Sequence, residues 1–432
     1  MDGATKRPAW SKAEIEALLA RENFAYQNIR LPYGLQTGGH DRSATADRIF
    51  PDDMAGKTVL DLGCSFGFFC FEALRRGARR VVGYDVDPDS VRRARLLAEC
   101  MGVDAEFHLR DIEREPLTER FDYVLCLNLL HHLKNPVGAL DNLIACTDER
   151  LVLEVASLGH HDRRKVKIGW LAEKLLARLP IMFVSRGGTR GRHQVQKFFI
   201  TPSALENLLI YQRGMFARLQ QQPSEHKNRH ITIAEKRRIG HLLVVSGPTS
   251  AGKKTVMSAL TANRLPDLAA HLGTTDASVW GKPLNAAKIY QPMEPEQERM
   301  ILHQDFMRPF MRSAMVHERD EANEILDTAK AITFVTVWTE PEQLIKQITA
   351  AEIEPALARG GKKPRRHLVI RELYGDRDKV LDHYERWFAF AAAKSADHVV
   401  IAPHEGNRLY SVDEWRALVG RRRATTALTP AG

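Results

Sequence analysis

The chain has 432 residues, which is long for a single domain, so two or three domains are expected, each able to bury its own core. Hydrophobic residues make up 44% and charged residues 27% of the chain, as in soluble globular proteins. The formal net charge of +9 permits an anionic partner such as RNA, a nucleotide or a phospholipid headgroup, but a solvated surface explains it equally well.

The composition also excludes several classes of site. The five cysteines show neither CxxC nor Cys/His metal spacing, so they are expected to be reduced core residues of a cytoplasmic protein. The charged N-terminus contains no apolar core of a secretory signal. The most apolar later stretch, residues 168–184, is interrupted by charged residues and a proline, so no membrane span is predicted.

The first predicted element is a helix over residues 11–21, with Ser11 as N-cap and Glu14 at the capping-box position. The polar, Gly-rich residues 31–50 that follow could form a lid or substrate loop, or a plain connector. We therefore treat residues 1–50 as an N-terminal helix and substrate loop.

A short apolar strand then leads into a glycine-bearing turn and a helix, in the sequence VLDLGCSFGFF at residues 59–69. Asp61 lies near the carboxyl end of the strand, and Gly63 and Gly67 bracket the turn, where the missing side chains let the backbone approach a ligand. The pattern DxGCxxG differs from the GxGxxG dinucleotide fingerprint. In open α/β sheets, the crevice beyond the strand ends is where cofactors bind.

Strands and helices alternate after Gly56, which predicts a parallel α/β sheet. Helices are expected over residues 68–76, ending at Gly77, and over residues 88–100, opened by Pro88. Three further strands end in polar residues, which are Asp85, Asp111 and Asn128, and a fifth strand follows in RLVLEVAS. Together with Asp61, these residues place polar groups at four strand ends facing one crevice.

These motifs resemble the class I S-adenosylmethionine-dependent methyltransferases, with DxGCxxG as motif I. The resemblance implies a Rossmann-like sheet, with Asp85 accepting hydrogen bonds from both ribose hydroxyls. It places Asp111 beside the adenine, with Ile112 lining the same slot, and the segment after Asn128 at motif IV. The implied cofactor site is Asp61, Gly63, Cys64, Gly67, Asp85, Asp111, Ile112 and Asn128.

Residues 30–235 also resemble, more loosely, the wobble-uridine tRNA methyltransferases that act on hydroxylated uridine. The likeness rests on YGLQTGGHDR before motif I and KFFITPSALENLL after it. It makes RNA one candidate acceptor beside a small metabolite or lipid. His132, or its neighbour His131, could serve as a general base, although LHHL segments also occur without a catalytic role.

The basic residues 160–200 form an insertion, either a cap over the acceptor pocket that grips an anionic substrate or a surface helix hairpin with solvated charge. A helix then starts at Thr201–Pro202. An antiparallel hairpin, FARLQQQ and RHITIAE, follows it and closes the methyltransferase domain of residues 51–237.

A second domain is predicted over residues 240–420 from HLLVVSGPTSAGKKT, a strand, a glycine-bracketed loop and a helix start. It resembles the Walker A loop of nucleotide kinases, most closely the guanylate-kinase-like group, in which backbone N–H groups and a lysine hold phosphates. The phosphate-binding residues would be Gly247, Gly252, Lys253, Lys254 and Thr255. Lys254 stands where the family has the magnesium-binding hydroxyl, which leaves the metal geometry open.

Asp305 ends another buried strand, where it could hold magnesium, act as a kinase-like base or cap the next helix. Further core strands are expected in ITFVTVW and HVVIA. The basic, Gly-hinged stretch at 358–371 could be a phosphoryl-transfer lid, an RNA-facing patch or a solvated loop. Residues 421–432 are expected to be a disordered tail.

The sequence thus predicts an α/β protein, with a Rossmann-like methyltransferase sheet followed by a P-loop α/β domain. The expected function is methyl transfer from S-adenosylmethionine to RNA or a small metabolite, with ATP or GTP, and magnesium if used, bound by the second domain. The alternatives are a nucleotide-regulated binding protein, or a lipid or metabolite methyltransferase with an inactive P-loop domain. The acceptor, the choice between ATP and GTP, and the oligomeric state carry no sequence signal.

Overall fold

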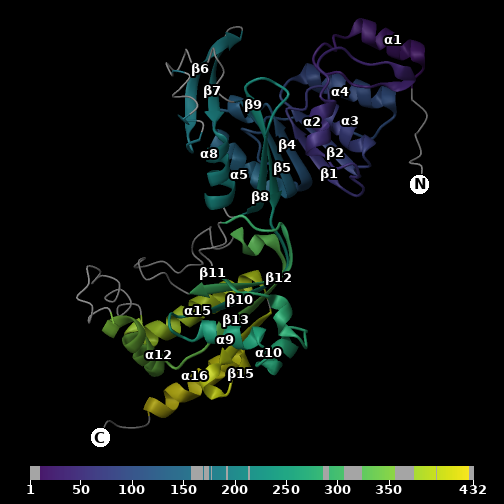
Figure 1. The fold of residues 1–432 in the computed structure, drawn as a ribbon. Helices are drawn as coiled ribbons and strands as arrows, with labels where there is room; N and C mark the ends of the chain where they lie inside the picture. Colours follow the sequence, from purple (N-terminus) through teal and green to yellow (C-terminus); the bar gives the residue numbers. More distant parts are fainter. Residues whose placement is uncertain are drawn as a thin grey trace. The chain divides into compact units, whose positions relative to one another are not determined.

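The computed structural model describes residues 10–156, 169, 175–176, 178–190, 193–212, 215–285, 291–305, 324–355, 374–395 and 397–427. The chain divides into two compact units, Met1–Lys236 and Arg237–Gly432 (Figure 1). The division falls beside Arg237, where the hairpin pattern places the end of the first domain.

The described part of the first unit is built on a seven-stranded sheet with the order β3-β2-β1-β4-β5-β9-β8 (Figure 1). Strands β1 to β5 are parallel, β9 is antiparallel to β5, and β8 is antiparallel to β9. Their bounds are β1 Thr58–Leu62, β2 Arg80–Asp85, β3 Glu106–Leu109, β4 Phe121–Leu127, β5 Thr147–Ala156, β8 Phe216–Pro223 and β9 Arg229–Lys236. The expected parallel sheet and its closing antiparallel hairpin are both present.

The strand order reverses between β1 and β4. From β1 the chain moves outward through β2 to β3, and then crosses back to β4 and continues to β5 on the other side. Connections from β1 and β4 therefore leave in opposite directions, which opens a crevice at their carboxyl ends. Asp61 and Asn128 lie at this switch point.

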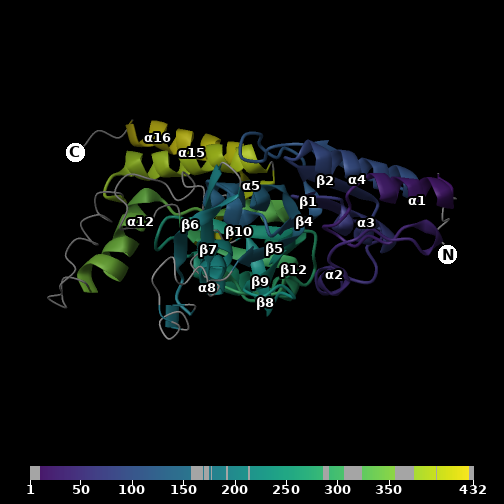
Figure 2. The same ribbon diagram turned by 90° about the horizontal axis from the view of Figure 1, so that it is seen from above.

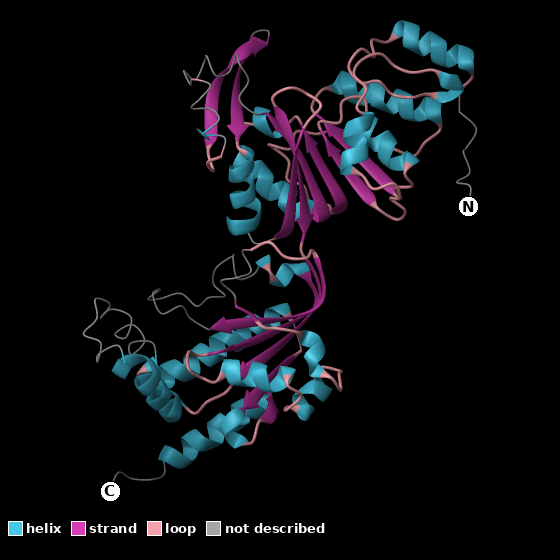
Figure 3. Cartoon of the chain, in the orientation of Figure 1, coloured by secondary structure: helices cyan, strands magenta, loops and turns pink. Residues whose placement is uncertain are grey.

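Helices cover both faces of this sheet, and each face has its own core (Figure 3). The helices are α1 Lys12–Arg21, α2 Ser43–Ile49, α3 Phe68–Arg75, α4 Pro88–Met101, α5 Pro136–Cys146 and α8 Pro202–Glu206. The predicted capping box of α1 is confirmed, because Ser11 and Glu14 exchange side-chain and backbone hydrogen bonds. Helix α4 ends at Gly102 in the left-handed conformation that favours glycine.

A two-stranded sheet lies within the basic insertion. Strands β6 Met182–Arg190 and β7 His193–Ile200 form an antiparallel pair. The helix hairpin considered for residues 160–200 is therefore wrong for the described residues of 182–200, where residues 187–188 lie at an irregularity in the pairing of β6 with β7. Residues 157–168, 170–174 and 177 lie outside the described part of the chain.

The second unit contains a six-stranded sheet with the order β11-β12-β10-β13-β14-β15. All neighbours are parallel except β15, which is antiparallel to β14. The strands are β10 Arg238–Gly247, β11 Leu284–Asn285, β12 Glu296–Asp305, β13 Ala329–Val337, β14 His398–Ala402 and β15 Arg408–Ser411. The chain leaves β10 toward β11 and leaves β13 toward β14, so a second switch point lies between β10 and β13.

The helices of the second unit are α9 Lys253–Thr261, α10 Pro266–His271, α12 Pro341–Ile348, α15 Arg377–Lys394 and α16 Val412–Ala427. Helices α15 and α16 lie side by side (Figure 2), packed through the rings of Phe388 and Trp415 at 4.9 Å between centroids. The expected disordered tail is wrong for residues 421–427, which continue α16. No helix in the described residues has the length and apolar character of a membrane span.

Candidate functional site

Asp61 is a buried acid in the middle of the first sheet. It is 2% exposed, because β1 lies between β2 and β4 and its pairing partners there are Gly83 and Leu125. Its Oδ2 atom has no hydrogen-bond partner among the described residues. Burial, together with the nearby charge of Asp85, raises the pKa of Asp61 to about 8. A buried oxygen without a donor is costly and indicates a place for a ligand donor.

Different constraints favour glycine at the two positions of the turn. Gly67, at φ +88°, precedes α3, and a Cβ atom there would lie 2.5 Å from the ring of Phe107. Gly63, at φ +71°, donates its N–H to the carbonyl of Tyr84 at 2.8 Å. A Cβ atom at Gly63 would meet only Leu129, at 3.4 Å, so the left-handed backbone is the main constraint there.

Asp85 fastens the turn to the second strand. Its Oδ2 accepts the N–H of Ser65 at 2.9 Å, and its Oδ1 accepts the N–H of Asp87 at 3.0 Å. An ionised carboxylate offers about four lone-pair sites, so two of them stay available to a ligand. The position at the end of β2 agrees with the predicted ribose-binding acid.

The next predicted pair, Asp111 and Ile112, lies just beyond β3. Asp111 accepts the N–H of Glu113 at 3.0 Å and lies 3.3 Å from the guanidinium of Arg114, so it shapes its own turn. Ile112 is buried at the edge of the core that includes Tyr84. An adenine contact of these two residues remains a prediction.

Asn128 follows β4 with a φ of +60°, a conformation that Asn tolerates better than most residues. Its N–H donates to the carbonyl of Glu154 at 2.9 Å. Its side-chain Oδ1 is buried without a hydrogen-bond partner in the described chain, as is Asp61 Oδ2.

A cavity of about 220 Å³ is lined by both Asp61 and Asn128. Its lining residues are Tyr26, Gln27, His40, Arg42, Asp61, Gly63, Phe69, Leu127, Asn128, His226 and Arg229. Of the predicted cofactor residues, the cavity thus gathers Asp61, Gly63 and Asn128. It does not include buried Cys64, nor Gly67, Asp85, Asp111 or Ile112, and neither His131, which is buried, nor exposed His132 lines it.

Gln27 is a site residue that sequence reasoning missed. It is 7% exposed, and its Oε1 accepts the N–H of Phe66 at 3.0 Å and of Phe68 at 3.4 Å. Since Gly67 at the start of α3 has no side chain to cap the helix, Gln27 satisfies these backbone donors from a distant segment. No local sequence pattern marks such a long-range cap.

A buried ion pair was also missed. Arg42 Nη2 lies 2.8 Å from Glu154 Oε2, and Ser224 Oγ donates to the other oxygen of Glu154. Arg42 Nη1 lies 3.0 Å from His226 Nε2, and because a guanidinium only donates, that nitrogen accepts and the imidazole is neutral. Burial and the charge of Arg42 lower the pKa of His226 accordingly. The hairpin between β8 and β9 thus contributes a histidine to the cavity.

In the second unit, β10 runs into the glycine-bracketed loop and α9. Gly252 is the N-cap of α9 in the left-handed conformation, at φ +92°. Lys253 is 4% exposed, and its ammonium donates to the carbonyls of Gly247, at 3.0 Å, and Pro248, and pairs with Asp305 at 2.5 Å. Burial lowers the pKa of Lys253. Lys254 and Thr255 are exposed on the first turn of α9.

The remaining kinase-like predictions are placed only in part. Asp305 ends β12 beside Lys253, and the described residues contain no group of three or more His, Cys, Asp or Glu side chains that could hold a metal. The basic lid residues Arg359, Lys362, Lys363, Arg365, Arg366 and Arg371 lie outside the described residues.

Comparison with known proteins gives matches to methyltransferases. A family model described as a methyltransferase domain matches residues 53–175. A tRNA U34 carboxymethyltransferase of Campylobacter hominis is 33% identical over 92 residues, which are 21% of this chain and 32% of that protein. A ubiquinone biosynthesis O-methyltransferase of Psychrobacter cryohalolentis is 27% identical over 210 residues, covering 46% of this chain and 74% of that protein.

Among solved structures, the N-terminal domain of EvdMO1, crystallised in the presence of SAH and D-fucose, is 19% identical with a TM-score of 0.41. That likeness covers 55% of this chain and all of the other chain. The chain spans about a third of the length of the first curated relative that it matches. The first unit contains an S-adenosylmethionine-dependent methyltransferase domain, which the family model places over residues 53–175.

Proposed function

We propose that the first unit binds S-adenosylmethionine at the carboxyl edge of β1, β2 and β4 and transfers its methyl group to an acceptor in the adjoining cavity. The observation that carries this proposal is that Asp61 and Asn128 line one cavity at the switch point, and each has a buried side-chain oxygen without a donor among the described residues. The ammonium of a methionine moiety could donate to both oxygens. Its positive charge would also stabilise the ionised form of Asp61, whose pKa is raised to about 8.

Each predicted residue has a role in this proposal. Asp61, Gly63 and Asn128 would hold the methionine end, and Asp85 the ribose hydroxyls. Asp111 and Ile112 would border the adenine, while Cys64 and Gly67 shape the turn. The cofactor supplies a methyl group on a positively charged sulfur. The chain's part is to orient that group toward the acceptor and to exclude water, to which the buried lining residues Arg42, Asp61 and Phe69 would contribute.

The acceptor is proposed only as a class, RNA or a small metabolite, with a lipid as the alternative. The similar proteins have tRNA, a ribosomal protein and ubiquinone in their names, so they support no single class. Labelled S-adenosylmethionine should be incubated with the protein and separated RNA, lipid and small-molecule fractions. Label in one fraction that depends on Asp61 supports methyl transfer and names the class, and no transfer to any fraction contradicts the proposal.

We further propose that the second unit binds the phosphates of ATP or GTP at the loop from Gly247 to Gly252, which makes the chain bifunctional or nucleotide-regulated. The specific observation is Lys253, a buried cation held by the loop's own carbonyls at the second switch point. Phosphate oxygens would replace those carbonyls as partners of the ammonium, and Asp305 would be released to hold magnesium or a proton.

Equilibrium binding of labelled ATP and GTP to wild type, Lys253→Met and Lys254→Met tests this second proposal. Loss of at least about tenfold in affinity for Lys253→Met alone is expected, since one charge-assisted interaction contributes about 1.5–3 kcal/mol. Asp305→Asn should then abolish ATP consumption while it spares binding, if the unit is an active kinase. Wild-type protein that binds neither nucleotide at millimolar concentration would remove the claim.

A further inference from the structure

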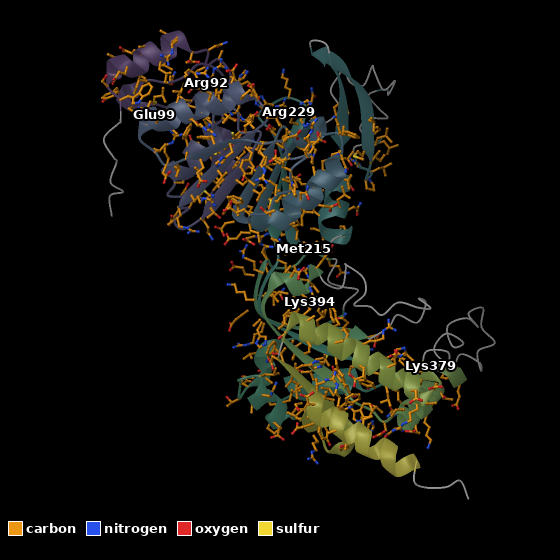
Figure 4. The ribbon with its side chains drawn as sticks, turned by 180° about the vertical axis from the view of Figure 1, so that it is seen from behind. Arg92, Glu99, Met215, Arg229, Lys379 and Lys394 are labelled. Atoms are coloured by element: carbon orange, nitrogen blue, oxygen red, sulfur yellow. The ribbon has the colours of Figure 1, made fainter. Side chains whose placement is uncertain are left out.

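Arg229 is a cation on the wall of the cavity, and it makes no ion pair among the described residues. Figure 4 labels Arg229, which stands at the start of β9, opposite Ala156 at the end of β5. It lines the same cavity as Asp61 and Asn128. Its side chain is half-buried, and within the described chain it makes no hydrogen bond or ion pair. Burial lowers the pKa of Arg229, opposed by the charge of Glu154. A half-buried guanidinium without a protein partner is available to an anionic ligand.

The acids around the cavity do not neutralise Arg229. Glu154 already accepts from Arg42 and Ser224, which occupies both of its oxygens. Burial and the charge of Asp85 raise the pKa of Asp61 to about 8, which favours its neutral form at pH 7. The neutral imidazole of His226 adds no negative charge. The cavity therefore carries an excess of positive charge at neutral pH.

We propose that the methyl acceptor is a small molecule with an anionic group, a carboxylate or a phosphate monoester, that Arg229 binds. This inference rests on the proposed methyl transfer and names the class of its substrate. A guanidinium presents two parallel N–H donors that match either anion, which fixes orientation as well as affinity. A cavity of about 220 Å³ with one such arginine suits a small molecule better than RNA, whose binding relies on many exposed phosphate contacts.

The carboxylate of the cofactor's own methionine moiety is the main competitor for Arg229, since Asp61 and Gly63 border the same cavity. The two possibilities differ in what the arginine stabilises. If Arg229 binds the acceptor, its removal leaves cofactor affinity intact. If it binds the cofactor, affinity for S-adenosylhomocysteine falls with the first substitution.

The experiment compares wild type, Arg229→Gln, Arg229→Lys and Lys227→Gln. Lys227 is the matched control, because it is an exposed cation in the same β8–β9 turn and does not line the cavity. Calorimetry first gives the affinity of each protein for S-adenosylhomocysteine. Inorganic phosphate and acetate are then titrated into each saturated complex, and the arginine Nε–H signals are followed by NMR.

We expect cofactor affinity within about twofold in all four proteins, since the inference assigns Arg229 to the acceptor, and an anion-dependent shift in wild type and Lys227→Gln. Arg229→Gln should lose at least about tenfold in anion affinity, the equivalent of about 1.4 kcal/mol, and Arg229→Lys should keep part of it. A response to acetate alone assigns a carboxylate, and a response to phosphate alone assigns a phosphate monoester.

Four results would overturn the inference. A fall of about tenfold or more in cofactor affinity in Arg229→Gln would assign Arg229 to the cofactor. No response of wild type to either anion would contradict the claim that the acceptor has an anionic group. It would not contradict the proposed methyl transfer. Arg229-dependent binding of an oligonucleotide, with no response to the free anions, would show that Arg229 binds RNA and not a small anionic molecule. Failure of wild type to bind S-adenosylhomocysteine would overturn the proposed function together with this inference.

Discussion

Gln27 Oε1 accepts the backbone N–H of Phe66 at 3.0 Å, so a side chain from the N-terminal segment holds the turn that follows β1. The same oxygen lies 3.4 Å from the N–H of Phe68, and Gln27 Nε2 donates to the carbonyl of Cys64 at 3.4 Å. The segment before the sheet therefore helps to hold the turn at the proposed cofactor edge.

Gln27→Leu should weaken both the turn and the cofactor site. The change keeps the size of the side chain but leaves buried N–H groups without an acceptor, at about 1–3 kcal/mol. We expect a lower melting temperature and an affinity for S-adenosylmethionine reduced by about tenfold. Gln36→Leu is the control, because Gln36 is exposed in the same segment. Equal effects of the two variants would contradict the role of Gln27.

Asp61→Asn should change how stability depends on pH. The pKa of Asp61 is about 8 in the folded protein against an ordinary value of 3.8, so between these values the folded state keeps a proton that the unfolded chain has released. The contribution of Asp61 to the free energy of unfolding therefore falls as pH rises from about 4 to about 8, by up to about 1.4 kcal/mol per pH unit.

Because asparagine does not ionise, Asp61→Asn should melt at a higher temperature than wild type at pH 8, and the difference should shrink toward pH 5. Thermal unfolding across this range is the measurement, with Asp104→Asn, an exposed acid before β3, as the control. A melting difference that does not vary with pH would refute the raised pKa.

Gly67→Ala should destabilise the first unit more than Gly63→Ala. The new Cβ atom at position 67 would lie 2.5 Å from the Phe107 ring, whereas at position 63 the nearest contact is 3.4 Å from Leu129. Position 63 then carries only the cost of a left-handed backbone, about 1 kcal/mol, and position 67 adds a steric overlap in the core. Denaturant unfolding of both variants measures the order, and the reverse order would show that the turn relaxes around Phe107.

Glu154→Gln should cost far more than a comparable change at the surface. It leaves the buried guanidinium of Arg42 without a counterion, and breaking a buried pair costs about 3–5 kcal/mol. Glu149, paired with Lys57 at 2.6 Å but partly exposed, is the matched control, and Glu149→Gln should cost at most about 1 kcal/mol. Chemical denaturation gives both values, and similar costs would mean that water reaches the Arg42 pair.

The sequence predicted the parts of the fold that depend on local patterns. Alternating apolar strands and amphipathic helices located β1 to β5, and the turn glycines and strand-end residues located Asp61, Gly63 and Asn128, because strand ends of a parallel sheet meet at one edge. The helix starts at Ser11 and Pro88 follow from local features, a side chain that caps its own helix and a proline at the first helical position, so they too were visible.

The missed residues all act over long sequence distances. Gln27 caps a helix that starts 41 residues later, Arg42 reaches Glu154 across 112 residues, and His226 enters from the last hairpin. None of them lies in a motif, since their role depends on tertiary packing. The β6–β7 hairpin was missed because the basic side chains of 182–200 suggested a solvated surface and obscured the strand pattern.

The central claim is that the edge of β1 and β2 binds S-adenosylmethionine, and calorimetric titration of wild type, Asp85→Ala and Asp104→Ala tests it most directly. Loss of the ribose acceptor should lower the affinity of Asp85→Ala by at least about tenfold, since hydrogen bonds to a charged group contribute about 1.5–3 kcal/mol each. Asp104→Ala should bind like wild type. Undiminished affinity in Asp85→Ala, in a protein that unfolds cooperatively, would contradict the account.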